Sequence, residues 1–314
     1  MIGEREVEGY EALTMASRDG VEAAFVPAAG MVGCSLRHRG DELLGQRGGL
    51  RNYVAQRSTM GIPLLYPWAN RLARRRFSVA GREVDLDSPS LPIAFDPNGL
   101  PIHGLLAGAG GWRVERHEPS ADGGVLAAAL DLGADPALAA AFPFPHRLSI
   151  EASLAGGELT IATTVVASGG APVPISFGYH PYFRLPGPDR ADWEVEIPVP
   201  ERLELDREMI PTGDRQAVRV APGPLGNRTF DDAYLAPPGA KSFALAGGGR
   251  RIEVSFAEGY PYAQVYAPAD DDVVALEPMT APTNALISGI GLRILEPAEE
   301  YRATFAVRVI DVGA

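Results

Sequence analysis

The feature that most constrains this chain is that its apolar runs are short, alternate with polar residues and end at glycine or proline. Residues 147–154 (RLSIEASL), 157–166 (GELTIATTVV) and 251–256 (RIEVSF) alternate as half-buried strands do. The 36 glycines and 28 prolines are spread along the chain and not gathered into a linker. The step AGGEL at 155–159 is typical of a hairpin between two strands. The pattern therefore predicts antiparallel sheet.

Helical signals are weak. Residues 135–145 (DPALAAAFPFP) predict one or two helical turns before the prolines stop them. We find no internal repeat, no low-complexity tract and no break in composition along the 314 residues. Many short strands with regular turns predict an all-β protein with few short helices, a large antiparallel sandwich or barrel. We expect a single domain over residues 1–314.

Charge and composition limit the classes of function. The formal net charge of −12 argues against binding of nucleic acid and suits a neutral or weakly charged small ligand. No apolar run approaches 18 residues and the acidic N-terminus lacks an apolar stretch, so we expect no membrane span and no signal peptide. The one cysteine, Cys34, excludes an internal disulfide and a cysteine-built zinc site, and it fits a cytoplasmic location.

Two segments place polar residues after apolar or aromatic ones in a way that suits hydroxyl-rich ligands. In 66–77 (YPWANRLARRRF), Asn70 offers a donor and an acceptor and Arg71 a rigid fork of donors. A surface turn with solvated arginines explains the same pattern. In 98–108 (NGLPIHGLLAG), His103 precedes Gly104, which permits close backbone approach. A histidine beside apolar residues is more often structural, so this site is a hypothesis.

Two further segments carry titratable groups in apolar surroundings. His180 lies among aromatic residues in 177–187 (FGYHPYFRLPG), where it is either a catalyst or a satisfied core residue. We expect Glu277 to end an apolar strand, VVAL, in 273–289, directly before Pro278. A carboxylate at such a place must be solvated, paired or functional, because an unpaired buried charge is costly.

The remaining polar residues give weaker signals. Asp231 and Asp232 precede an aromatic strand, a position that is usually a turn. We expect no role for His38, His117 or His146, with the first two exposed and the third in a turn. Nucleotide, metalloprotease and hydrolase motifs such as GxGxxG, GxxxxGK[ST], HExxH and GxSxG are absent from the sequence.

Taken together, in order and in chemistry, these segments resemble the motifs of the aldose 1-epimerase (galactose mutarotase) family. The likeness spans roughly residues 20 to 305 and rests on the following segments: AAGMVGCSLRHRGDELLG (28–45), ANRLARRRF (69–77), PIHGLL (101–106), FGYHPYFRLPG (177–187), FDDAYL (230–235) and LEPMTAPTNAL (276–286). Two of them depart from galactose-specific members, which have a Thr-Asn-His run before the aromatic pair and a Pro-Asp-Ala step after the glutamate. The resemblance therefore leaves the particular aldose open.

The resemblance implies a β-supersandwich with a sugar site in an open cleft on one sheet. It implies interconversion of the α and β anomers of an aldose, without a cofactor or metal, by a monomer or homodimer whose partner is a small sugar. Glu277 matches the family's general base and His180 its general acid. The sugar-contacting positions match Asn70, Arg71, His103 and Asp231, with Asp231 preferred to Asp232 because it directly follows Phe230. Aromatic residues are expected to wall the cleft or stack on the sugar, namely Trp68, Tyr179, Tyr182 and Phe183.

Three other functions stay open at this point. A hexose-6-phosphate epimerase of the same superfamily would bind phosphate through Arg74, Arg75 and Arg76, which otherwise form a solvated hairpin tip. A sugar-binding module would use the cleft without turnover. The third is a lyase or hydrolase, since sandwich folds of this type host both. A glycoside hydrolase would need two carboxylates across the bond, for which Asp231 and Glu277 are candidates.

Overall fold

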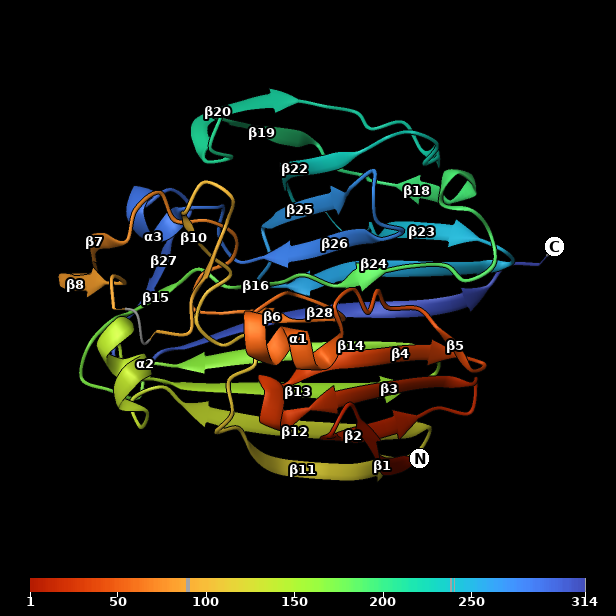
Figure 1. Cartoon of the computed structure of the whole chain (residues 1–314), viewed down its shortest axis with the longest axis horizontal. Coiled ribbons are helices and arrows are strands. Elements are labelled where there is room, and N and C mark those ends of the chain that lie inside the picture. Colours follow the sequence, from red (N-terminus) through yellow and green to blue (C-terminus); the bar gives the residue numbers. More distant parts are fainter. Residues whose placement is uncertain (89–90, 238, 240, 314) are drawn as a thin grey trace.

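A nine-stranded antiparallel sheet is the largest layer of the protein (Figure 1). The computed structural model describes residues 1–88, 91–237, 239 and 241–313. In spatial order the strands of this sheet are β11 (Arg113–Ser120), β12 (Gly123–Asp131), β13 (Arg147–Ala155), β14 (Glu158–Val166), β28 (Glu300–Asp311), β24 (Arg250–Glu258), β23 (Phe243–Gly247), β18 (Glu194–Glu196) and β21 (Gly223–Pro224).

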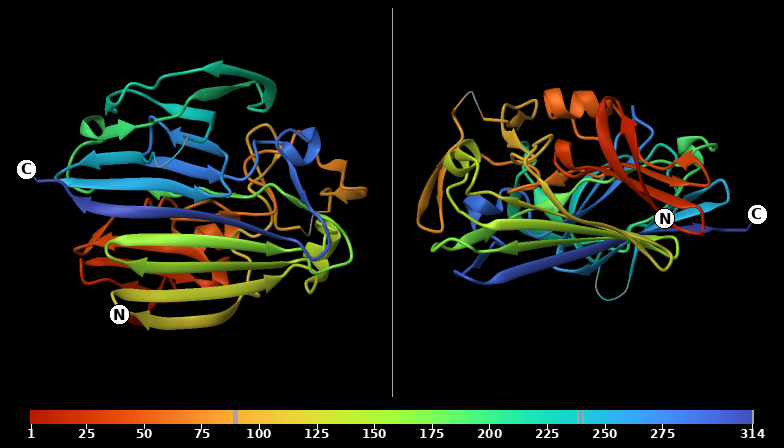
Figure 2. Two further views of the ribbon diagram at one scale, coloured as in Figure 1. Left: turned by 180° about the vertical axis from the view of Figure 1, so that it is seen from behind. Right: turned by 90° about the horizontal axis from the view of Figure 1, so that it is seen from below.

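Two smaller antiparallel sheets pack on this layer. One is a meander of β1 (Ile2–Val7), β2 (Tyr10–Ala16), β3 (Val21–Val26), β4 (Val32–His38) and β5 (Asp41–Glu42). It lies over the β11–β14 part of the large sheet, and Figure 2 shows the two as stacked layers. The other contains β20 (Pro211–Ala217), β19 (Glu201–Leu205), β22 (Phe230–Leu235), β25 (Tyr262–Ala267), β26 (Val274–Met279), β16 (Gly178–Tyr179) and β6 (Leu64–Leu65), with β17 (Tyr182–Phe183) also paired to β26.

Short ribbons and helices complete the described part of the chain. The ribbons are β7 (Arg76–Val79) with β8 (Arg82–Asp85), β9 (Ala94–Phe95) with β10 (Pro101–Ile102), and β15 (Val173–Ile175) with β27 (Arg293–Leu295). The helices are α1 (Gly49–Gln56), α2 (Pro136–Ala141) and α3 (Ala285–Ser288), with single 3-10 turns at Pro27–Ala29 and Arg190–Asp192. The expected all-β supersandwich with few short helices is confirmed.

The local sequence explains these elements. Gly156 and Gly157 both have positive φ, 53° and 73°, and close the hairpin between β13 and β14, as the AGGEL step predicts. Asp135 caps α2 by accepting hydrogen bonds from the amides of Ala137 and Leu138, and Pro143 follows the helix end. Alternate residues of the long strands enter one buried cluster that reaches from Leu13 to Val309.

Two histidines for which we expect no role are buried, and the expectation that His38 is exposed is wrong. His38 is buried, because Arg250 from β24 covers it and donates a hydrogen bond of 3.2 Å to its Nδ1. His146 is fully buried between Tyr66, whose hydroxyl contacts Nε2, and the Phe144 carbonyl oxygen, 2.5 Å from Nδ1. Burial lowers the pKa of His146 to about 4, so it packs as a neutral ring. In both cases the partner comes from a distant part of the chain.

Candidate active site

Strand register brings His180 and Glu277 together. In the pairing of β16 and β17 with β26, Gly178 lies opposite Met279 and Tyr182 opposite Ala275. The residues midway between these pairs are His180 and Glu277, so both side chains point to the same face of the sheet. That face is opposite to the one carrying Val274 and Leu276, which enter the main core. The expectation that Glu277 ends its strand is wrong, since β26 continues through Pro278 to Met279.

A close backbone crossing positions His103 beside this pair. The Tyr66 segment runs next to Gly104, and a Cβ at Gly104 would meet the Tyr66 carbonyl oxygen and lie 2.8 Å from the Tyr66 nitrogen. Gly104 also has a φ of 76°, which favours glycine. The His103 amide donates to the Asn70 carbonyl oxygen at 3.0 Å. The predicted close approach at Gly104 is therefore confirmed, and it joins the Asn70 and His103 segments.

Glu277 and His180 form a buried pair whose hydrogen-bonding capacity is incompletely used. Glu277 Oε1 lies 3.3 Å from His180 Nε2, and the two side chains are 1% and 7% exposed. Among the described residues, Glu277 Oε1 and the Nδ1 atoms of His180 and His103 have no hydrogen-bond partner. The rings of His103 and His180 meet edge to face, with centroids 5.5 Å apart. Buried polar atoms are normally bonded, so this group of atoms is suited to receive a polar ligand.

Burial shifts the pKa values of the pair in opposite directions. It raises the pKa of Glu277 well above its ordinary value, the charge of Asp231 raises it further, and Arg71 opposes both. Burial lowers the pKa of His180 well below its ordinary value, with added effects of His103 and Arg47. These shifts make the carboxylate a stronger base and the imidazolium a stronger acid. In the protein alone they favour an uncharged pair that holds one proton.

Arg71 is fixed by two neighbours at the edge of the site. Its Nε donates to Asp96 Oδ2 at 2.8 Å, and its Nη1 donates to Asn70 Oδ1 at 2.9 Å. Asp96 is itself held by the amides of Asn98 and Leu100.

Burial, with the charges of Arg71 and Arg47, lowers the pKa of His103 to about 3. His103 is therefore a neutral ring at ordinary pH and suits hydrogen bonding rather than proton donation.

Asp231 and Gln264 complete the polar wall. Both aspartates lie within β22 and not in a turn before it, which corrects the alternative interpretation of that segment. Asp231 accepts a 2.8 Å hydrogen bond from Gln264 Nε2, and Gln264 lies opposite Glu277 in the sheet. Asp232 is 3.7 Å from Arg202 and does not line the cavity. Gln264 was not predicted from the sequence, because a single amide within a strand belongs to no motif.

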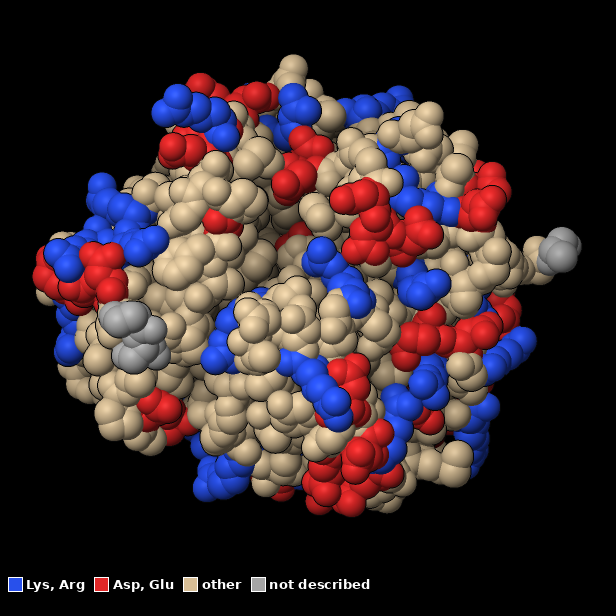
Figure 3. All heavy atoms as spheres, in the orientation of Figure 1, with Lys and Arg blue, Asp and Glu red and all other residues tan. Residues whose placement is uncertain are grey.

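These side chains line one cavity of about 370 Å³. Figure 3 shows the molecule hollowed near the position of β25 and β26, with charged side chains around the hollow. All six predicted site residues line it: Asn70, Arg71, His103, His180, Asp231 and Glu277. Residues that the sequence analysis did not single out also line it, including Arg47, Thr59, Phe95, Asp96, Gln264 and Tyr266. The cavity is large enough for a monosaccharide and has polar groups on several sides.

Some expected neighbours are elsewhere. Of the four aromatic residues expected at the cleft, Tyr182 lines the cavity, whereas Trp68, Tyr179 and Phe183 are buried in the main core. The arginines considered for phosphate binding do not line the cavity. Arg75 and Arg76 are exposed and pair with Asp85 and Asp87 of the adjacent ribbon, at 2.8 to 3.8 Å.

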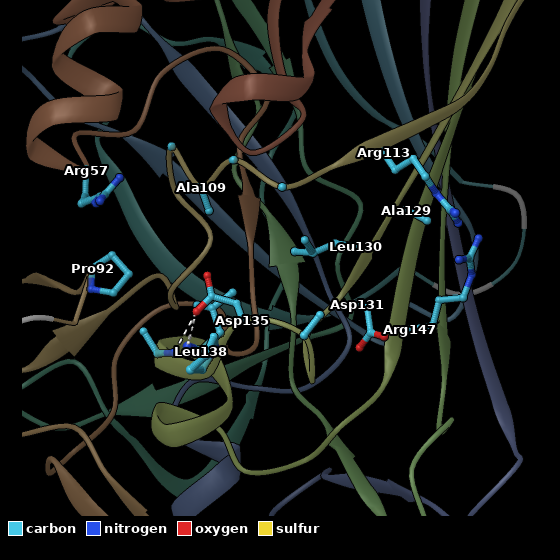
Figure 4. A pocket seen from close by; sticks show the side chains of 16 residues that line it. Arg57, Pro92, Ala109, Arg113, Ala129, Leu130, Asp131, Asp135, Leu138 and Arg147 are labelled. Carbon is cyan, nitrogen blue, oxygen red and sulfur yellow. Dashed lines mark hydrogen bonds between the residues drawn. The ribbon is translucent and has the colours of Figure 1, made fainter.

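A second hollow, of about 850 Å³, lies beside α2 and shares Arg57 with the cavity (Figure 4). Its charged groups already have partners within the fold. Arg113 and Arg147 both contact Glu115. Asp135 caps α2, and the dashed lines in Figure 4 mark its hydrogen bonds. Arg57 donates to the carbonyl oxygens of Val54 and Ala107, and Asp131 accepts from the Gly133 amide. The unpartnered, strongly shifted groups are in the smaller cavity.

Neither a metal-binding cluster nor a membrane-spanning helix occurs among the described residues. No group of three or more His, Cys, Asp or Glu side chains is arranged to hold a metal ion. Within the same residues, no helix has the length and apolar character needed to cross a membrane.

The fold and cavity define a supersandwich of the galactose mutarotase type. A galactose mutarotase-like protein from Clostridium acetobutylicum superposes with a TM-score of 0.86 at 18% identity, over 99% of each chain. Galactose 1-epimerase from Lactobacillus acidophilus superposes with a TM-score of 0.77 at 15% identity, over 100% of this chain and 98% of that one. At these identities the likeness is one of fold.

Sequence comparison assigns the family. The sequence model of aldose 1-epimerase matches residues 15–308, so this chain belongs to the aldose 1-epimerase family. The uncharacterized protein YihR of Escherichia coli is 24% identical over 261 residues, which cover 78% of this chain and 77% of YihR. Galactose mutarotase of Rattus norvegicus is 34% identical over 159 residues, which cover 46% of this chain and 39% of that protein.

Proposed function

We propose that this protein is an aldose 1-epimerase that interconverts the α and β anomers of a neutral aldose, with Glu277 as general base and His180 as general acid. The observation that carries the proposal is the buried Glu277–His180 pair, 3.3 Å apart, with unpartnered polar atoms facing a cavity of monosaccharide size. Recognition alone does not require a buried carboxyl next to a buried imidazole, because such a pair costs folding free energy.

In the proposed reaction, Glu277 takes the proton of the anomeric O1 hydroxyl while His180 delivers a proton to the ring oxygen. The C1 to ring-oxygen bond breaks as the C1–O1 bond becomes a carbonyl, giving the open-chain aldehyde. Rotation about C1–C2 presents the other carbonyl face, and the ring closes with the two roles exchanged. On closure His180 recovers the proton that it donated and Glu277 gives up the proton that it took, so the pair ends as it began.

The net charge of the Glu277–His180 pair, which is zero when the pair holds one proton, favours a neutral substrate. The pair holds one proton and has no net charge whether that proton is on the imidazole of His180 or on the carboxyl of Glu277. A neutral sugar can therefore bind without proton uptake or release. Asn70, Arg71, His103, Asp231 and Gln264 are the proposed contacts to the other hydroxyls, since they present both donors and acceptors to the cavity. The sugar-phosphate alternative loses its support, because Arg74, Arg75 and Arg76 do not line the cavity.

Polarimetry tests the proposal directly. Freshly dissolved α-D-glucose and α-D-galactose should reach equilibrium rotation faster with the protein than without it. Glu277→Gln should reduce the acceleration by roughly 10²-fold or more, the usual scale for a lost acid or base. Because Gln matches the size of Glu and burial raises the pKa of Glu277, the variant should keep or exceed the native Tm at neutral pH.

Other outcomes point to other functions. Acceleration with glucose 6-phosphate and not with glucose would replace the neutral-aldose proposal by the sugar-phosphate alternative. Binding of sugar without acceleration would indicate a recognition module. Release of reducing sugar from a glycoside would indicate a hydrolase. A folded Glu277→Gln variant with native activity would overturn the assignment of the base.

A further inference from the structure

The imidazole of His180 is covered by the ring of Tyr182, a residue that the reaction above does not use. The two ring planes are inclined by 17° and their centroids are 4.1 Å apart, so the rings stack. The Tyr182 hydroxyl lies 3.1 Å from His180 Nε2. Because the rings are nearly parallel, this hydroxyl approaches Nε2 from above the imidazole plane. The in-plane direction of Nε2 is thereby left for Glu277 and the cavity.

Tyr182 is itself held from several sides. Its hydroxyl bonds to Thr59 Oγ1 at 2.6 Å, and its backbone amide donates to the Gly61 carbonyl oxygen at 2.9 Å. The Arg47 guanidinium lies 4.7 Å from the ring centroid and pairs with Asp271 at 3.1 Å. Tyr182 and Thr59 are 1% and 7% exposed, so water does not substitute for these contacts. The ring is an immobile surface against which the imidazole rests.

A histidine needs such a surface to act as a directed acid. The terminal torsion of a histidine side chain is broad, and a modest rotation takes Nε2 away from its target. His180 Nδ1 has no hydrogen-bond partner among the described residues, so no bond at the far side of the ring fixes its rotation. Orientation then depends on the stacked tyrosine with its hydroxyl and on Glu277 beside Nε2. A displacement of about 1 Å at a reacting group can cost roughly 10²-fold in rate.

We propose that Tyr182, anchored through its hydroxyl by Thr59, is a positioning residue that fixes the ring plane of His180. This inference rests on the proposed epimerase function. Tyr182 stacks on the proposed acid, so its loss acts through His180. The Thr59 hydroxyl acts one step further away, through Tyr182.

The test compares Tyr182→Phe, Thr59→Val and Thr59→Ser by kcat, KM and the pH profile of kcat/KM. Tyr182→Phe keeps the stacked ring and removes the hydroxyl, and it should lower kcat by roughly tenfold with KM changed less than twofold. Thr59→Val should have a similar effect, whereas Thr59→Ser keeps the hydroxyl and should retain most of kcat. The double variant Tyr182→Phe with Thr59→Val should lose no more kcat than Tyr182→Phe alone, because both substitutions act through the same contact to His180.

The chain offers a matched control in the core. Thr163 Oγ1 and the Tyr179 hydroxyl also bond, at 2.7 Å, and both are buried away from the cavity. Tyr179→Phe should lower Tm without changing kcat or the pH profile. An equal loss of kcat in Tyr179→Phe would show a general effect of stability and overturn the proposal. Native kcat and pH profile in Tyr182→Phe, or additive losses in the double variant, would also overturn it.

A readout without turnover separates this inference from the proposed function. The ¹⁵N chemical shifts of the His180 ring nitrogens respond to the orientation and the contacts of the ring. They should change in Tyr182→Phe and Thr59→Val and stay unchanged in Tyr179→Phe. If the native protein accelerates mutarotation of no aldose, the epimerase proposal fails, while these shifts still decide whether Tyr182 fixes the ring. Unchanged His180 shifts in Tyr182→Phe would overturn the positioning role in either case.

Discussion

At the scale of the residue, His180 and His103 have similar surroundings and different expected roles. His180→Asn should lower kcat at least tenfold with sugar binding retained, because Asn keeps a polar contact and cannot donate the catalytic proton. His103→Asn should act mainly on KM, since the pKa of His103, about 3, makes it a neutral partner. Initial polarimetric rates at varied sugar concentration distinguish the two. A His180→Asn variant altered in KM alone would make His180 a contact residue.

Asp231 should tune the pH range of activity. Its negative charge raises the pKa of Glu277, so Asp231→Asn should lower that pKa. At high pH the Glu277–His180 pair loses its one proton and kcat/KM falls, which is the alkaline limb of the pH profile. This limb should then move to lower pH. KM should rise by about tenfold or more if a charged hydrogen bond to the sugar is lost.

The matched control is Asp232→Asn, because Asp232 is oriented to Arg202 and does not line the cavity. This variant should leave the alkaline limb in place. An unmoved limb in Asp231→Asn would contradict the assignment of that limb to Glu277.

The sequence indicated site residues where they stand in motifs and missed them where they stand alone. Asn70, Arg71, His103, His180, Asp231 and Glu277 belong to segments with recognisable order, and the structure places them in one cavity. Their proposed roles stay predictions. Gln264, Thr59 and Tyr266 have no neighbouring signal, and they join the site only through strand register and a loop crossing. The burial of His38 was also missed because it depends on a distant segment, namely Arg250 from a strand more than 200 residues away.

At the scale of the element, the interrupted strand β16–β17 aligns the acid with the base. A Cβ at Gly178 would meet the Met279 sulfur and lie 2.7 Å from the Pro278 carbonyl oxygen, so Gly178→Ala must displace β26 from β16. We expect destabilisation of about 1–3 kcal/mol, as for other overpacked sites. The rate should fall further than stability explains, because Glu277 shifts relative to His180.

The control for this element is Gly170→Ala, where a Cβ meets no atom within 4 Å. Urea unfolding and polarimetry of both variants measure the two effects. Loss of stability in Gly178→Ala with native turnover would show that pair geometry tolerates movement of β26.

Strands were more predictable than the breaks within them. Alternation predicts β13, β14 and β24 because each has one face on the core, and paired glycines predict the turn between the first two. The predicted end of the Glu277 strand was wrong. Pro278 suggests that the strand stops, but Pro278 lies within β26 and is paired with Ala263 of β25. Proline lacks the amide hydrogen, and Pro278 lies between the pair of Gly178 with Met279 and the pair of Tyr182 with Ala275, so little pairing is lost on that side of β26.

At the scale of the whole molecule, the two faces of the eight-stranded sheet differ, one packing in the core and the other carrying the cavity. The face of the eight-stranded sheet that meets the large sheet is apolar, as Val265, Val274 and Leu276 show, while its other face carries the polar cavity. Polar and titratable groups thus gather where they interrupt the core least. The prediction of one domain over residues 1–314 stays a prediction, as does the cytoplasmic location.

Ligand linkage gives a whole-molecule prediction that separates binding from turnover. An aldose that binds the folded state alone, at about 100 times its Kd, stabilises it by about 2.7 kcal/mol. With an unfolding entropy near 2.1 cal/mol/K per residue, a chain of 314 residues should gain about 4 °C in Tm. Glu277→Gln should show a similar gain although its turnover is lost, and EDTA should change neither the gain nor the native rate. A sugar that is turned over without raising Tm at such concentrations would contradict binding in the folded cavity, whereas loss of the Tm gain on chelation would show that sugar binding depends on a metal ion.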